Sequence, residues 1–166
     1  SLRWASSFAS MLRAGGLSCE VVPSATDIDA LALGKLIWAS CLWLVAHKFG
    51  GRPVGECHAR SDSNETLRSL VAELLPMARQ AIGEDQLASS PIAGEALGCV
   101  DTVLEGMCAY STRIAYAVPS HAMALRELPF RNGWFLAHSP AAEQPLHVRL
   151  LQEMGADIDF VAHAHS

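Results

Sequence analysis

The chain is poor in charged residues. Asp, Glu, Lys and Arg make up 17% of its 166 residues, and its formal net charge is −5. The twelve Lys and Arg residues form no basic stripe, so a nucleic-acid-binding role is not expected. A hydrophobic content of 51% argues against disorder, and this length suffices for one domain with a real core. The positive mean hydropathy of 0.22 indicates that a partner or further sequence covers part of the apolar surface.

The sequence also lacks a CxxC pair, and its five cysteines are an odd number. Cys41, Cys99 and Cys108 lie in apolar helical patterns, where a free cysteine acts as a small core residue. This usage favours a reducing compartment, so we expect a cytoplasmic protein. The N-terminal residues do not match a signal peptide. The apolar run at 36–46 is shorter than the roughly 20 residues that a membrane span needs, so no membrane partner is expected.

No metal site is predicted from the spacing of histidine and cysteine. The Cys57–His58 pair and the histidines at 163 and 165 are spaced wrongly for a closed tetrahedral site. No Ser-His-Asp or Cys-His nucleophile is legible either, although seven histidines leave chance pairings open.

Only one strand is indicated, at Cys19–Val22, and Pro23 stops it. A lone strand forms no sheet, so we expect that it has lost its neighbours or pairs with another chain. The chain then begins inside a domain. Hydrophobic periodicity predicts helices elsewhere, with a loop at 83–91, so the fold class is all-α with one leftover N-terminal strand. The expected helices cover 2–14, a segment from a cap at 24 or 26 to 49, 62–82, 92–118, 120–125, 128–138 and 144–154.

Lys35 is the only charged residue between Leu31 and Ala46. Burying an unpaired ammonium is costly, so such a lysine is usually paired, deprotonated or facing a cleft. In that setting it can donate a proton or bind an anionic substrate. The alternative is a lysine at the helix edge, with its stem on apolar surface and its head in water. The tryptophans at 38, 43 and 134 are expected to be core or interface anchors.

Three motifs follow one another along the chain: LGKLIW around Lys35, GRPVGE at 51–56 and ELPFRNGW at 127–134. In this order the chain resembles a divergent member of the ketopantoate reductase (2-dehydropantoate 2-reductase) family, over its C-terminal helical domain. The resemblance implies a helical bundle of the kind shared with 6-phosphogluconate dehydrogenase. It also implies NADPH-dependent reduction of a 2-oxo acid in pantothenate biosynthesis, and a homodimer. The implied division is a Rossmann-domain remnant at 1–25, a substrate and dimerisation domain at 26–155, and a tail at 156–166.

The resemblance implies that Lys35 is the general acid that protonates the ketone oxygen and that Glu127 is its active-site partner. From the residues alone, Glu127 is equally well read as a charge favoured at the N-terminal end of a helix. The sequence has no G-x-G-x-x-G turn, so the chain alone is not expected to bind NADPH or to be active.

Four positions that the resemblance assigns to substrate binding carry apolar side chains in this chain. They are Ala39, Trp43 and Val54, where the family has asparagines, and Ala115, where it has a serine. This difference implies a less polar 2-oxo acid or ketone as substrate, or a degenerate site. The alternative function is a stand-alone, non-catalytic dimerisation module, in which orphan strands or apolar helices of two copies pack together.

Overall fold

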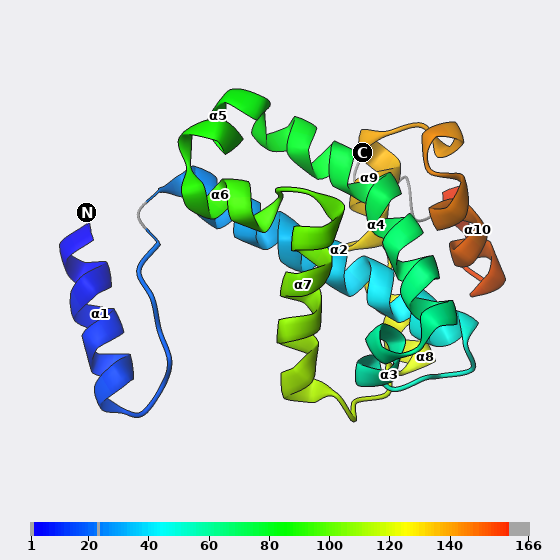
Figure 1. Ribbon diagram of the computed structural model, residues 1–166, viewed down its shortest axis with the longest axis horizontal. Coiled ribbons are helices and arrows are strands. Elements are labelled where there is room, and N and C mark those ends of the chain that lie inside the picture. The colour runs from blue at the N-terminus through cyan, green and yellow to red at the C-terminus, as the bar shows by residue number, and fades with distance from the viewer. Residues whose placement is uncertain (1, 23, 160–166) are drawn as a thin grey trace.

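The computed structural model describes residues 2–22 and 24–159, and the side chains from residue 5 onward. These residues form an all-α fold, as predicted, and contain no strand. Figure 1 shows α2 running through the middle of the bundle. The helices are α1 Leu2–Ala14, α2 Ala25–Lys48, α3 Val54–Ala59, α4 Ser61–Ile82, α5 Glu84–Ser89, α6 Pro91–Ala96, α7 Val100–Ser111, α8 His121–Glu127, α9 Asn132–His138 and α10 Pro145–Glu153, with 3-10 turns η1 Thr112–Ile114 and η2 Ala141–Glu143.

The core forms where α2 and α4 pack side by side, with α6, α7 and α10 against them. Helix α2 begins at Ser24, whose side-chain oxygen accepts the Asp27 backbone N–H at 3.1 Å. Helix α4 confirms the helix expected at 62–82, and the members of its apolar stripe are all buried. Those members are Leu67, Leu70, Val71, Leu74, Leu75, Ala78 and Ile82.

Helix α2 is also long and apolar enough to cross a membrane by length and composition alone. The apolar run therefore extends beyond the 36–46 segment of the sequence-based expectation. Nine residues of α2 are buried inside the bundle, which is how the central helix of a globular core behaves. The length test is therefore weak evidence for a membrane span.

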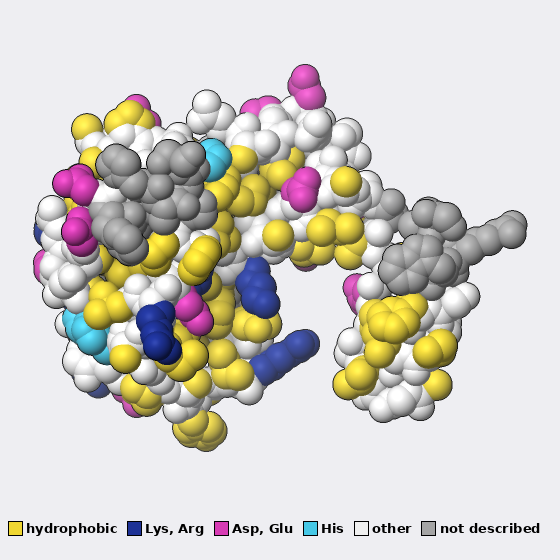
Figure 2. Space-filling view, turned by 180° about the vertical axis from the view of Figure 1, so that it is seen from behind, with side chains coloured by type: hydrophobic (Ala, Val, Ile, Leu, Met, Phe, Trp, Pro, Cys, Tyr) yellow, Lys and Arg dark blue, Asp and Glu magenta, His cyan; other side chains and the backbone are white. Residues whose placement is uncertain are grey.

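The predicted strand at Cys19–Val22 is wrong. This segment is irregular, and the described residues offer no second strand with which it could form a ladder. The Cys19 carbonyl instead accepts a hydrogen bond from Nε of Arg13 in α1, at 2.7 Å. Figures 1 and 2 show α1 standing apart from the bundle at the end of this linker.

The boundaries of several short helices also differ from the prediction. The segment 54–59 and part of the expected loop at 83–91 are helical, as α3 and α5. The helix expected at 92–118 is divided into α6 and α7, and Nη1 of Arg79 in α4 donates to the carbonyls of Leu97 and Gly98 at this break, at 2.7 and 2.5 Å. Those two carbonyls lie between α6 and α7. The Arg79 side chain thus satisfies carbonyls that the N–H groups of a further helical turn would otherwise bind.

Two cysteines expected in the core lie at the surface. Cys41 is buried as predicted, whereas Cys99 and Cys108 are exposed. Their apolar surroundings in the sequence belong to the opposite face of α7, where Val103, Leu104 and Met107 are buried.

Candidate functional site

Lys35 lies in α2 with an exposed side chain. No hydrogen bond or ion pair of its ammonium is found within residues 24–159. An exposed ammonium carries no burial cost and stays accessible to a ligand. Ala39 and Trp43 follow at spacings of four residues, so they share the face of Lys35, and both are half-buried.

Glu127 is the last residue of α8, not the first of the next helix. The N-terminal placement is therefore wrong: residues 128–131 form turns, and α9 begins at Asn132. The Glu127 carboxylate pairs with the guanidinium of Arg131, one turn later. That guanidinium lies over the Trp43 ring, 4.5 Å from its centroid. Arg131 thus joins Glu127 to Trp43, two positions that the resemblance assigned to one site.

The Arg131 side chain is unusual because it is largely buried and incompletely hydrogen-bonded. Its side chain is only 13% exposed, and its Nε is buried without a hydrogen-bond partner. Burial lowers the pKa of its guanidinium from the ordinary value, and the charge of Glu127 opposes that effect. No hydrogen bond or ion pair joins Lys35 to this cluster among the described residues.

The backbone segments around Val54 and Ala115 lie against each other. The Val54 N–H donates to the Ala117 carbonyl and the Gly55 N–H to the Ala115 carbonyl, both at 2.9 Å. A Cβ atom on Gly55 would lie 2.9 Å from that of Ala115, so only glycine allows this approach. The GRPVGE motif therefore packs directly against the end of η1.

A pocket of about 360 Å³ opens beside this contact, between α3 and the C-terminal end of α7. Ala115 lines it, and Val54 lies between two of its lining residues. The lining residues are Pro53, Gly55, Glu56, His58, Ala59, Cys108, Ser111, Thr112, Ala115 and Tyr116.

Ser111 is the buried polar centre of this pocket. Its hydroxyl oxygen accepts the Trp38 indole N–H at 3.0 Å and lies 3.0 Å from Nε2 of His58. An indole N–H can only donate, so all three groups are satisfied when the serine proton points to Nε2 of the imidazole. Burial lowers the pKa of His58, which favours this neutral form.

Sequence reasoning missed Ser111 and His58, which are 53 residues apart. A signal was present in their spacing. His58 lies one helical turn after Val54, and Ser111 one turn before Ala115. Polar side chains therefore stand close to two apolar positions that the resemblance assigns to substrate binding.

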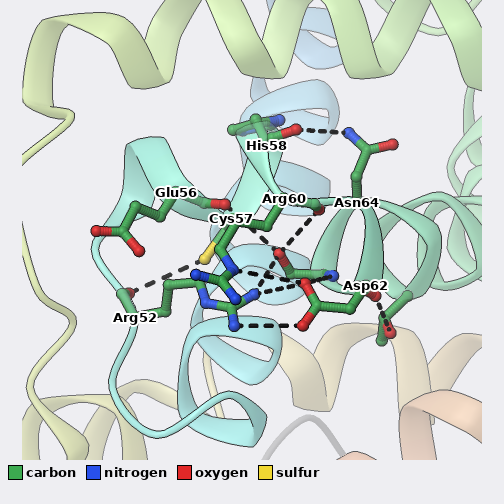
Figure 3. A network of polar contacts seen from close by, with 9 residues as sticks. Arg52, Glu56, Cys57, His58, Arg60, Asp62 and Asn64 are labelled. Atoms are coloured by element: carbon green, nitrogen blue, oxygen red, sulfur yellow. Dashed lines mark hydrogen bonds and ion pairs between the residues drawn. The ribbon is translucent and has the colours of Figure 1, made fainter.

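Two other polar networks are structural. Arg52 binds Asp62 through two nitrogen–oxygen contacts of 2.8 and 3.3 Å (Figure 3). This contact holds the 50–53 turn against α4. The Arg52 guanidinium also covers the Phe49 ring. In the bundle interior, His147 is hydrogen-bonded to Asn132 and Gln144. Asn132, the asparagine of the ELPFRNGW motif, therefore forms part of a hydrogen-bond network in the buried core.

Within the described residues, no group of three or more His, Cys, Asp or Glu side chains could hold a metal ion. His163 and His165 lie outside the described residues. Searches with family models, curated proteins and solved structures found no match to this chain.

Proposed function

We propose that this chain is the substrate-side helical domain of an NADPH-dependent oxidoreductase that resembles ketopantoate reductase and reduces a 2-oxo acid or related ketone. One observation carries the proposal. Lys35, Ala39 and Trp43 share a face of α2, and Trp43 is linked through Arg131 to Glu127. Segments that are nearly a hundred residues apart in the sequence thus come together.

The chemistry expected of these residues is proton donation and charge placement. The Lys35 ammonium would donate a hydrogen bond to a ketone oxygen and then the proton that the oxygen needs as it becomes an alcohol. Glu127 would be the counter-charge, held in place by Arg131. Ala39 and Trp43 would offer the substrate an apolar wall, which suits a less polar ketone than ketopantoate.

The residues of this chain do not fit NADPH. The sequence has no glycine-rich phosphate-binding turn, and residues 2–22 and 24–159 form no strand on which such a turn could stand. In this proposal the dinucleotide binds to another part of the parent protein, and we assign no step of its chemistry to the present chain.

The decisive experiment uses the two lysines of the chain, Lys35 and Lys48. The chain, joined to its natural upstream sequence, is assayed for NADPH oxidation with a panel of 2-oxo acids and ketones. Loss of a general acid should lower kcat about 10²- to 10⁴-fold in Lys35→Ala. Lys48→Ala, which removes an exposed ion pair with Glu153, is the matched control and should keep wild-type kcat. Equal turnover of the two variants would refute the role of Lys35.

A second candidate function, a non-catalytic dimerisation module, is favoured by α1. This helix stands apart from the bundle (Figure 1), and Met11 within it and Leu17 just after it are 68% and 59% exposed. A second copy of the chain would cover these side chains. A clean monomer at tens of micromolar would argue against it.

A further inference from the structure

The pocket between α3 and the end of α7 has a distinct electrostatic character. Glu56 is its only formally charged lining side chain, and no Lys or Arg lines it. The Glu56 carboxylate is exposed and has no hydrogen bond or ion pair with the residues that the structure describes. Figure 3 shows it extending away from the contact between Arg52 and Asp62. The Arg52 guanidinium is paired with Asp62, and its charge acts on Glu56 without a hydrogen bond, so the carboxylate is available to a ligand.

The second negative contribution comes from the backbone. Ser111 is the last residue of α7, a helix of 12 residues. The C-terminal end of a helix carries a partial negative charge of about half an electron, which favours a nearby cation. Thr112 and Ala115, just beyond this end, line the same pocket. Carboxylate and helix end therefore act with the same sign.

The polar centre of the pocket adds an acceptor without adding positive charge. The Ser111 oxygen has two lone pairs, of which one receives the Trp38 N–H. When the serine proton points to Nε2 of His58, the second lone pair remains for a donor from a ligand. Because the imidazole is neutral in this arrangement, it does not repel a cation.

The walls of the pocket are largely apolar and suit the hydrocarbon part of a small organic molecule. Pro53, Gly55, Ala59 and Ala115 are apolar, and Tyr116 lies at the rim with 96% of its surface exposed. An aromatic ring at such a rim can cover a bound ammonium through its π face. A pocket of about 360 Å³ is within the range of small-molecule sites.

We infer that this pocket binds a small organic ammonium compound, with its N–H groups directed to Glu56, the Ser111 oxygen and the C-terminal end of α7. The proposed catalytic residues Lys35 and Glu127 do not line this pocket, whereas Ala115, a position that the resemblance assigns to substrate binding, does.

The test is an NMR titration of the whole chain, with benzylammonium as the probe and benzyl alcohol and benzoate as its neutral and anionic counterparts. We expect benzylammonium alone to shift amide resonances in α3 and around residues 111–116. Glu56→Gln should weaken binding about fivefold, the upper end for an exposed charge pair. Glu105→Gln changes an exposed glutamate of α7 outside the pocket and should leave the affinity unchanged.

A second variant tests the aromatic contribution. Tyr116→Leu keeps an apolar side chain but removes the π face, so affinity should fall about two- to fivefold. The inference is overturned if benzyl alcohol binds as well as benzylammonium, if Glu56→Gln and Glu105→Gln behave alike, or if no amide of the pocket shifts at about 10 mM probe, a concentration that detects very weak binding.

Discussion

His147 is fully buried in α10, and both of its ring nitrogens have partners. Its Nδ1 lies 2.7 Å from the Gln144 side-chain oxygen, and its Nε2 lies 2.9 Å from the Asn132 amide nitrogen. The oxygen can only accept and the amide nitrogen can only donate. The ring proton must therefore lie on Nδ1, and Nε2 has no room for a second proton without turning Asn132.

This arrangement makes stability depend on pH. Burial lowers the pKa of His147 to about 3, whereas an unfolded histidine titrates near about 6.5. Between these values the unfolded chain binds one proton more than the folded chain. The free energy of unfolding should therefore rise with pH in this window, and fall by about 1.4 kcal/mol per unit of acidification below about pH 6.

Urea unfolding at a series of pH values, for the wild type and His147→Gln, measures this contribution. The variant cannot titrate, so its stability should fall less steeply between about pH 6 and 4. Carboxyl groups such as Asp62, whose pKa is lowered by Arg52, lose their contribution at lower pH and do so in both proteins. The same pH slope in both proteins would contradict the assignment.

At the scale of elements, Glu73 in α4 caps the beginning of α10. Its two carboxylate oxygens each accept a backbone N–H, from Leu146 and His147, at 2.9 Å. These are first-turn donors that no intrahelical carbonyl can reach. The negative charge also lies at the positive end of the helix, which adds to the stabilisation.

Replacing Glu73 by Ala should cost about 1–3 kcal/mol, because two half-buried donors lose a charged acceptor. The free energy of unfolding in urea measures this loss, and hydrogen exchange at residues 146 and 147 should accelerate. Glu65→Ala, an exposed position on the same helix, is the control and should change stability by less than about 0.5 kcal/mol. Equal losses in the two variants would show that the cap is not stabilising.

The elements that sequence reasoning predicted are those with long, regular patterns. The stripe on α4 fixed both its existence and its buried face, and α1 spans the expected 2–14. The short helices α3 and α5 were not predicted, because six residues are too few to show a helical periodicity. The division between α6 and α7 was not predicted for a different reason. The carbonyls at this break bind Arg79 of another helix, and no local pattern records that contact.

The same contrast holds for the candidate site. Lys35 was visible as an isolated charge, and Trp43 and Glu127 were chosen by the resemblance. Their link through Arg131 was not expected, since a salt bridge at a spacing of four residues looks like ordinary surface chemistry. The pairing of Ser111 with His58 could not be predicted from the sequence, because the packing of α3 against α7 brings the two residues together.

At the scale of the whole molecule, the bundle forms the main buried cluster and none of the described residues of α1 belongs to it. The main buried cluster begins at Ala30 and contains no residue of α1 or of the linker. Figure 2 shows open space between this helix and the body of the molecule. An isolated helix of 13 residues is marginal in water, so we expect α1 to need a surface to pack against.

A chain shortened to begin at Ser24 separates the two possibilities for α1. It keeps the cap of α2 and the whole buried cluster, so its free energy of unfolding should stay within about 1 kcal/mol of that of the full chain when both are monomeric. If a second copy covers α1, the full chain should sediment as a dimer at tens of micromolar and the shortened chain as a monomer. Met11→Lys in the full chain should then weaken the dimer, because it places a charge in the apolar contact. A full chain that sediments as a monomer would exclude the dimerisation module, and a shortened chain that fails to fold would show that α1 belongs to the bundle.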